Sequence, residues 1–128
     1  MEQKPSVLIV EDNERNRRLF HLVIHSMGCE TRLAENGAEG LRMVEAALPD
    51  LILLDIQMPV LDGMTVIAKL REEERTRLIP VVAVTSFAMP GDRERLLAAG
   101  FIDYLSKPID TQLLIQTVER HLPARPDA

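Results

Sequence analysis

Short apolar runs alternate with amphipathic stretches along the chain. The apolar runs predict five strands, at residues 6–10, 29–33, 51–54, 81–84 and 103–106. The amphipathic stretches have apolar residues at helical spacing and predict helices at residues 14–27, 38–47, 63 to about 73, 91 or 92 to 99, and 111–121. Strands that alternate with helices of this length form a parallel sheet with right-handed crossovers, so the pattern predicts a doubly wound α/β fold.

The same spacing predicts which face of each helix is buried. In the first helix it places Leu19, Leu22, Val23 and Met27 inward, and in the third Met64, Ile67, Ala68 and Leu70. Phe20 and Ile24, one helical turn apart, fit either the core or a partner surface. The unbroken apolar run from Leu51 to Leu54 indicates a strand that is buried on both faces.

Composition is that of an ordinary globular protein. The 128 residues are 46% hydrophobic and 27% charged, and the net charge of -5 gives no positive field for direct DNA binding. Cys29 is the only cysteine, which excludes an internal disulfide and fits a reducing cytoplasm. No apolar run approaches the length that a bilayer requires, so membrane insertion is not expected. We expect one domain over residues 1–128, with its core at about 6–122, a polar tail at 123–128 and no attached output domain if the chain is complete.

Charged side chains follow three of the predicted strands. Glu11 and Asp12 follow the first, Asp55 follows the third, and Lys107 with Pro108 follows the fifth. An open parallel sheet collects ligands at the carboxyl ends of its strands, so these groups should converge. Clustered carboxylates repel one another unless a hard cation or a lysine lies among them. The arrangement predicts a site for a divalent metal and a phosphoryl group.

Each of these residues also has an ordinary structural explanation. Glu11 and Asp12 could cap the first helix, and Asp55 could be a turn residue, although burial without a partner would be costly there. Thr85, after the fourth strand, could satisfy backbone groups, and Lys107 before proline could be turn chemistry. Found together in chain order, they form a specific signature that coincidence explains poorly.

Five motifs carry a resemblance to a known family: VLIVEDN at 7–13, DLILLDIQMP at 50–59, DG at 62–63, VAVTS at 82–86 and SKP at 106–108. In them the chain resembles the receiver domains of bacterial two-component response regulators, from residue 7 to about 122. Within that family it resembles the single-domain cell-division regulators of the DivK type, through EDNE at 11–14, LFH at 19–21 and FAM at 87–89 before Gly91-Asp92. The resemblance implies a CheY-like (βα)5 fold with strand order 2-1-3-4-5.

The resemblance also implies roles for the strand-end residues. Asp55 would accept a phosphoryl group from the phosphohistidine of a histidine kinase or histidine phosphotransferase. Asp12 and Asp55 would bind Mg²⁺ directly, Glu11 through water and Gln57 through its backbone carbonyl, and Mn²⁺ can substitute. Lys107 would pair with a phosphoryl oxygen, since phosphoryl transfer depends on positioning and charge compensation.

A conformational switch is implied as well. The Thr85 hydroxyl would move to the phosphoryl group, Tyr104 would turn inward, and the Lys107-Pro108 peptide bond would be cis. We therefore expect the face around Arg93, Leu97, Tyr104 and the last helix to change on phosphorylation. Gln57 and Phe87 would flank the approach of the hydrolytic water. The expected partner surface comprises Asn13, Arg15, Asn16, Leu19, Pro108 and Ile109, whose charged members could equally be a solvated helix face.

The expected function is that of a cytoplasmic signalling domain, not an enzyme, that promotes only its own phosphorylation and dephosphorylation. Its partners would be a histidine kinase or phosphotransferase and a downstream regulatory protein; it would be a monomer, with dimerisation on phosphorylation left open. The main alternative is a receiver that docks partners without phosphorylation or belongs to a hybrid histidine kinase. A haloacid dehalogenase-type phosphatase would need an acid at Gln57, a flavodoxin needs aromatics to stack on flavin, and a nucleotide-binding protein needs a glycine motif that does not occur.

Overall fold

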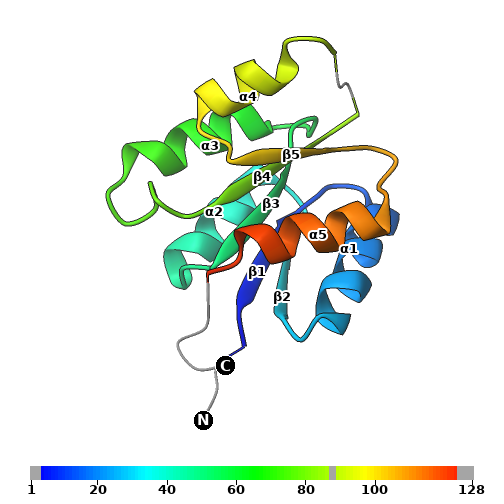
Figure 1. Ribbon diagram of the computed structural model, residues 1–128. Coiled ribbons are helices and arrows are strands. Elements are labelled where there is room, and N and C mark those ends of the chain that lie inside the picture. The colour runs from blue at the N-terminus through cyan, green and yellow to red at the C-terminus, as the bar shows by residue number, and fades with distance from the viewer. Residues whose placement is uncertain (1–3, 87–88, 124–128) are drawn as a thin grey trace.

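The computed structural model describes residues 4–86 and 89–123, in which strands and helices alternate (Figure 1). The elements are β1 (Ser6–Val10), α1 (Glu14–Ser26), β2 (Glu30–Ala34), α2 (Gly37–Ala46), β3 (Leu51–Asp55), α3 (Gly63–Glu72), β4 (Val81–Thr85), α4 (Asp92–Ala99), β5 (Asp103–Ser106) and α5 (Thr111–His121). The strands form one parallel sheet in the order β2-β1-β3-β4-β5. The predicted doubly wound α/β fold and its strand order are confirmed.

Several boundaries differ from the prediction by one residue, and two of them have a clear local cause. β2 runs from Glu30 because its register on β1 pairs Ser6 with Glu30. α2 begins at Gly37 because the Asn36 side chain accepts a hydrogen bond from the Glu39 N–H and caps the helix. Capping of α3 by Asp62, which accepts from the Thr65 N–H, is an example of the same effect.

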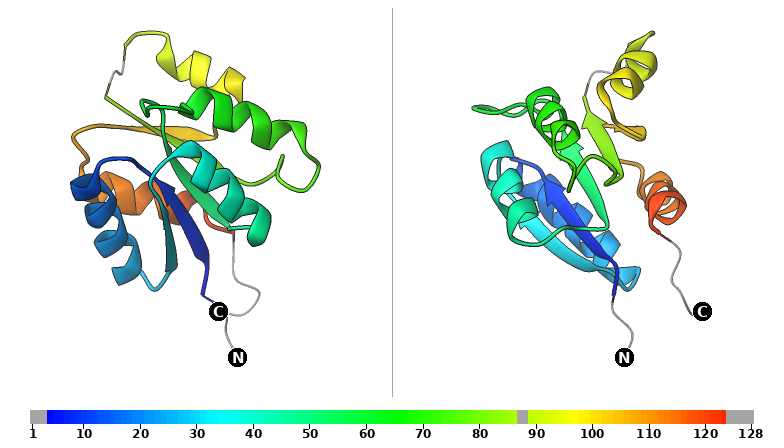
Figure 2. Two further views of the ribbon diagram at one scale, coloured as in Figure 1. Left: turned by 180° about the vertical axis from the view of Figure 1, so that it is seen from behind. Right: turned by 90° about the vertical axis from the view of Figure 1, so that its left-hand side faces the viewer.

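The helices cover both faces of the sheet (Figure 2), and side chains alternate between two cores. On β3, Ile52 and Leu54 belong to the core beneath α2, α3 and α4, whereas Leu51 and Leu53 belong to the core beneath α1 and α5. Leu51 to Leu54 are all buried, as the apolar run predicted, and Asp55 at the end of β3 is buried as well. Among the described residues, no helix combines the length and apolar character needed to cross a bilayer.

The predicted inward faces of α1 and α3 are partly wrong. In α1 the fully buried residues are Phe20 and Ile24, while Leu22 is 59% exposed. Leu22 lies two positions from each of them, which places it on the opposite side of a helix with 3.6 residues per turn. The same rule applies in α3, where Val66 is buried and Ala68 is exposed. Phe20 and Ile24 are therefore core residues.

The guanidinium of Arg71, in the last turn of α3, binds backbone carbonyls of two other segments. Nε and Nη2 donate to the carbonyl of Gly100 at 3.1 and 2.7 Å, directly after α4. Nη1 donates to the carbonyls of Arg77 at 2.8 Å and Ile79 at 2.9 Å, before β4. Gly100 has φ of 116°, and a Cβ there would lie 2.9 Å from the Arg71 Cγ. Arg71 thus joins α3, the entry to β4 and the end of α4.

Candidate functional site

The strand register brings the predicted charged groups to one edge of the sheet. Val10 pairs with Leu54 across β1 and β3, so Glu11 and Asp55 each follow directly at the ends of these strands. On the other side of β3, Thr85 ends β4 and pairs with Ser106, the residue before Lys107. Segments that are far apart in sequence therefore deliver their polar residues to the same end of the sheet.

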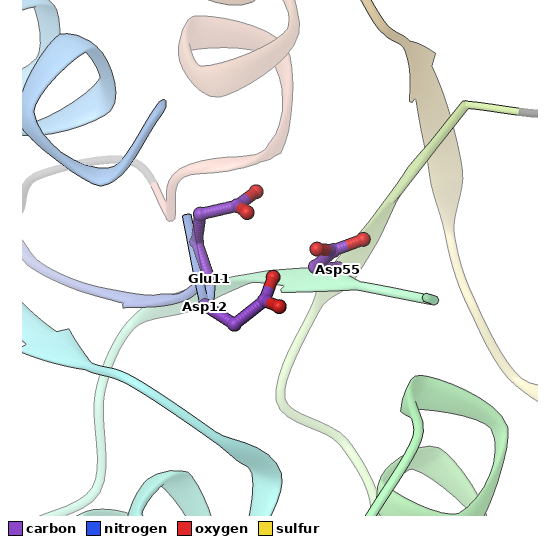
Figure 3. A group of neighbouring side chains, drawn as sticks. All are labelled: Glu11, Asp12 and Asp55. Carbon is purple, nitrogen blue, oxygen red and sulfur yellow. The ribbon is translucent and has the colours of Figure 1, made fainter. Parts of the chain in front are cut away.

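Three carboxylates face a common space at this edge (Figure 3). Glu11 and Asp12 project from the end of β1 toward Asp55 at the end of β3. One oxygen of each lies within 4.8 Å of the others, and Glu11 and Asp55 are each only 1% exposed while Asp12 is exposed. Hard divalent cations are bound by oxygen ligands of this kind, so the three residues could hold one.

The Lys107 ammonium lies beside this cluster. Its Nζ lies 3.1 Å from Oδ2 of Asp55 and 3.1 Å from Oε1 of Glu11. It donates hydrogen bonds to Asp55 Oδ2 and, at 3.3 Å, to Glu11 Oε2. Within the described part of the chain, the buried Oε1 of Glu11 has no partner with hydrogen-bond geometry, so its contact with Lys107 is ionic. An acceptor is thus left available to a water molecule or a metal-bound water.

Burial and repulsion raise the pKa of Asp55 to about 7. Burial makes the largest contribution, the Glu11 carboxylate adds to it, and Lys107 opposes both. Burial alone would lower the pKa of Lys107, but hydrogen bonding and attraction to Glu11 and Asp55 outweigh it, and its pKa is raised. One ammonium does not fully compensate the acidic cluster, and an added divalent cation would restore the balance.

The loop between β1 and α1 is held by the Glu11 carboxylate, which accepts from the Asn13 N–H at 3.1 Å, and by two further side chains. Asn13, and neither Glu11 nor Asp12, caps α1 by accepting a hydrogen bond from the Asn16 N–H at 2.9 Å. The capping explanation for the acidic pair is therefore wrong. Arg17 donates to the carbonyl of Glu11 at 2.9 Å and to that of Asp12 at 3.3 Å. Sequence reasoning missed Arg17, because nothing in a helical arginine indicates that it turns back to the preceding loop.

The loop after β3 folds back closely on the aspartate. A Cβ on Gly63 would lie 2.6 Å from the Asp55 carbonyl oxygen and 2.8 Å from the Ile56 Cα, both of them backbone atoms. Val60, which is 95% exposed, has φ of 72°, a region that β-branched residues rarely adopt. The glycine of the DG motif is therefore required by the close approach of α3 to the end of β3.

The Gln57 side chain links this loop to the end of β4. Its Nε2 donates to Thr85 Oγ1 at 2.9 Å, and its Oε1 accepts from the Ser86 N–H at 3.1 Å. The main-chain N–H of Gln57 donates to Asp55 Oδ1 at 3.1 Å. The sequence suggested a metal-binding role for the backbone carbonyl of Gln57 and a position beside the hydrolytic water. It did not reveal these side-chain hydrogen bonds, since a glutamine in a loop gives no sign of which groups it reaches.

The remaining predicted residues lie around this edge or next to it. Tyr104 is half-buried and packs against the core beneath α2, α3 and α4. The Lys107-Pro108 peptide bond is cis. The residues of the expected partner surface are exposed at Asn13, Arg15 and Pro108 and partly buried at Asn16, Leu19 and Ile109. Phe87 lies outside the described residues.

Sequence comparison gives a family match over residues 7–119, to the response regulator receiver domain. The polar-differentiation response regulator DivK of Brucella anthropi is 46% identical over 117 residues, which cover 91% of this chain and 95% of that protein. DivK of Brucella ovis is also 46% identical over 117 residues, with the same coverage.

Structure comparison points the same way. Chemotaxis protein CheY4 of Vibrio cholerae superposes with a TM-score of 0.88 at 27% identity, covering 94% of this chain and all of that one. The receiver domain of the sensor histidine kinase PA1611 of Pseudomonas aeruginosa superposes with a TM-score of 0.84 at 35% identity, covering 93% and 98% of the two chains. That structure is described as having a magnesium ion coordinated in its active-site cleft.

Proposed function

The chain belongs to the response regulator receiver domain family, and from this premise we propose that it is a single-domain response regulator phosphorylated on Asp55. The observation that carries the proposal is the position of the Asp55 carboxylate. It is buried, 3.1 Å from the Lys107 ammonium and within 4.8 Å of the oxygens of Glu11 and Asp12. A carboxylate placed between one ammonium and two further acids suits phosphoryl transfer assisted by a divalent cation.

The proposed reaction transfers a phosphoryl group from a phosphohistidine to an Asp55 oxygen. The P–N bond to the imidazole breaks as the P–O bond to Asp55 forms, and the freed imidazole nitrogen takes up a proton. Lys107 compensates charge on the phosphoryl oxygens, and the Thr85 hydroxyl donates a hydrogen bond to one of them. Hydrolysis of the acyl phosphate would return the carboxylate.

The donor set at this edge fits Mg²⁺. Carboxylate and carbonyl oxygens are the ligands that a small hard cation prefers, and the unsatisfied Oε1 of Glu11 can accept from a metal-bound water. Asp12 and Asp55 would bind the ion directly, Glu11 through water and Gln57 through its backbone carbonyl; Mn²⁺ can substitute. When bound, the ion supplies the positive charge that lets an anionic donor approach an anionic carboxylate.

Phosphorylation of Asp55 would act on other proteins by changing the surface that they contact. Movement of the Thr85 hydroxyl toward the phosphoryl group would open space into which Tyr104 turns, changing the surface of α4, β5 and α5. A histidine kinase or histidine phosphotransferase would dock on the start of α1 and the loop after Lys107. The residues of that surface are Asn13, Arg15, Asn16, Leu19, Pro108 and Ile109. A downstream regulatory protein would read the phosphorylated state, as the similarity to DivK supports.

Incubation with acetyl phosphate and Mg²⁺, followed by mass spectrometry, tests the proposal. The protein should gain the mass of one phosphoryl group, and the gain should be lost when Mg²⁺ is removed with a chelator. A phosphopeptide map should assign the group to Asp55. Absence of any phosphorylation in Mg²⁺ would contradict the proposal and favour a domain that docks its partners unphosphorylated.

A further inference from the structure

The side-chain amide of Gln57 forms hydrogen bonds with two groups near Asp55, the Thr85 hydroxyl and the Ser86 N–H. The Ser86 N–H can only donate, so the amide oxygen must face it, and the amide nitrogen must then face the Thr85 hydroxyl oxygen. Both contacts have good hydrogen-bond lengths, 3.1 and 2.9 Å. The amide orientation is therefore determined by its partners, and the side chain bridges the β3–α3 loop and the end of β4.

The same residue is attached to the proposed acceptor. The Gln57 N–H donates to Asp55 Oδ1 at 3.1 Å, while Lys107 binds Oδ2. Gln57 thus contacts Asp55 through its main chain and Thr85 through its side chain. Since its main chain is held at Asp55, the side chain limits how far the Thr85 hydroxyl and the Ser86 N–H can shift relative to that carboxylate.

From these contacts we infer that the Gln57 side chain is a latch, a positioning residue that holds Thr85 and Ser86 in the unphosphorylated arrangement. The inference rests on the proposed function, in which Thr85 moves to a phosphoryl group on Asp55. That movement releases the bond from Gln57 to Thr85, and an anionic phosphoryl oxygen is a stronger acceptor for the Ser86 N–H than a neutral amide oxygen. The loss of these two hydrogen bonds therefore reduces the net free energy of phosphoryl binding.

Removal of the latch should therefore tighten binding of a phosphoryl analogue. Beryllofluoride with Mg²⁺ is the appropriate probe, because it mimics an acyl phosphate and is not hydrolysed, which separates binding from phosphate lifetime. Gln57→Met keeps the length and approximate volume of the side chain and removes both hydrogen bonds. Loss of two partly exposed neutral hydrogen bonds predicts beryllofluoride binding about 3- to 10-fold tighter than in the parent. Binding is followed by titration of backbone amide resonances.

Two controls identify the cause of the change. Gln116→Met makes the same exchange at an exposed position of α5 and should leave the affinity unchanged. In a Thr85→Val background, Gln57→Met should give a smaller gain, because only the bond to Ser86 is then left to release. An undiminished gain there would assign the effect to something other than Thr85 and overturn the latch. Thermal unfolding of each variant checks that it is folded.

Failure of the latch and failure of the proposed function give different results. If the parent does not respond to beryllofluoride in Mg²⁺, the phosphoacceptor function itself is contradicted. If the parent binds and Gln57→Met binds equally or more weakly, the function stands and the latch is overturned. Weaker binding would show that Gln57 holds Thr85 ready for the phosphoryl group.

Discussion

Two aspartates at opposite ends of the sheet, the buried Asp55 and the half-buried Asp103, each contact basic side chains, but their pKa values shift in opposite directions. Asp103, at the start of β5, accepts from His121 Nε2 at 3.0 Å and from Arg120 Nη1 at 3.2 Å. Burial alone would raise the pKa of Asp103, but hydrogen bonds from His121 and the Tyr104 N–H, and electrostatic attraction to His121 and Arg120, lower it. The pKa of Asp55, in contrast, is raised to about 7.

The difference comes from the neighbours and not from the residue type. Asp55 is deeper, with its side chain 1% exposed against 17% for Asp103, and it has a second buried carboxylate beside it in Glu11. Asp103 has donors on several sides and stabilises the junction of β5 and α5. The positive charge around Asp55 does not balance the negative charge of the acidic cluster. This site therefore favours binding of a divalent cation, and the contact of Asp55 with Lys107 is a poor structural ion pair.

The largest expected difference between the two aspartates is in phosphorylation. Asp55→Asn should lower the yield from acetyl phosphate and Mg²⁺ at least about 100-fold, because the nucleophilic oxygen is replaced by an amide. Asp103→Asn, a matched change at the other end of the sheet, should be phosphorylated like the parent. Intact-protein mass spectrometry measures both. Equal loss in the two variants would mean that folding, and not the acceptor, had been disturbed.

Among the stability changes, removal of the Lys107 ammonium should have the largest effect on the free energy of unfolding. In metal-free buffer at pH 8, Lys107→Met should lower the free energy of unfolding by about 2–4 kcal/mol, because it leaves Asp55 and Glu11 without their cation. Urea unfolding measures the change, and Lys69→Met, at an exposed position of α3, is the control and should have little effect. A Lys107→Met variant as stable as the parent would show that the carboxylates are better solvated than their burial indicates.

Asp55→Asn should stabilise the fold in metal-free buffer at pH 8, by about 1–3 kcal/mol. The folded-state pKa of about 7 lies above the ordinary value of 3.8, so the folded protein holds a proton that the unfolded chain releases between these values. The contribution of Asp55 to stability therefore falls as pH rises from about 4 to about 7. The gain from Asn should shrink as pH falls from about 7 to about 4 and should be small below pH 4. A destabilised Asn variant at pH 8 would contradict the electrostatic comparison.

Asp103→Asn should have the smallest effect and the opposite sign. We expect a loss of about 0.5–1 kcal/mol at pH 7, since Arg120 is largely exposed and solvent screens the pair. The lowered pKa of Asp103 means that its contribution is fully present above 3.8 and is lost as pH falls through the folded-state value. Urea unfolding should show a smaller loss at pH 3 than at pH 7. Glu119→Gln, an exposed change on α5 next to Arg120, is the control.

The sequence was a good guide to the fold and to where the site lies, for a physical reason. Apolar runs such as Leu51–Leu54 mark buried parallel strands, and the polar residue after each strand must lie at the carboxyl edge of the sheet. Glu11, Asp55 and Lys107 could therefore be placed together without coordinates. That logic depends on backbone direction, which the alternation of strands and helices determines. The strand order, in contrast, was implied by the resemblance to receiver domains and not by the pattern.

Other features depend on side-chain packing, which the pattern does not determine. Leu22 and Phe20 are both apolar, and only the docking of α1 on the sheet decides that Phe20 is buried. Arg17 and Gln57 act through hydrogen bonds to loops that are brought near them by tertiary structure. A polar side chain with several rotatable bonds can reach many partners, so its sequence position does not identify the one it binds.

The contacts of Arg71 have a mechanical consequence for α4. Four of its hydrogen bonds hold the carbonyls of Gly100, Arg77 and Ile79, so the C-terminal end of α4 is secured to α3 and to the entry of β4. A helix that is held at one end can rotate about that end but cannot translate as a whole. Any displacement of α4 would then be a pivot about Gly100, with the greatest travel at its first turn, around Asp92.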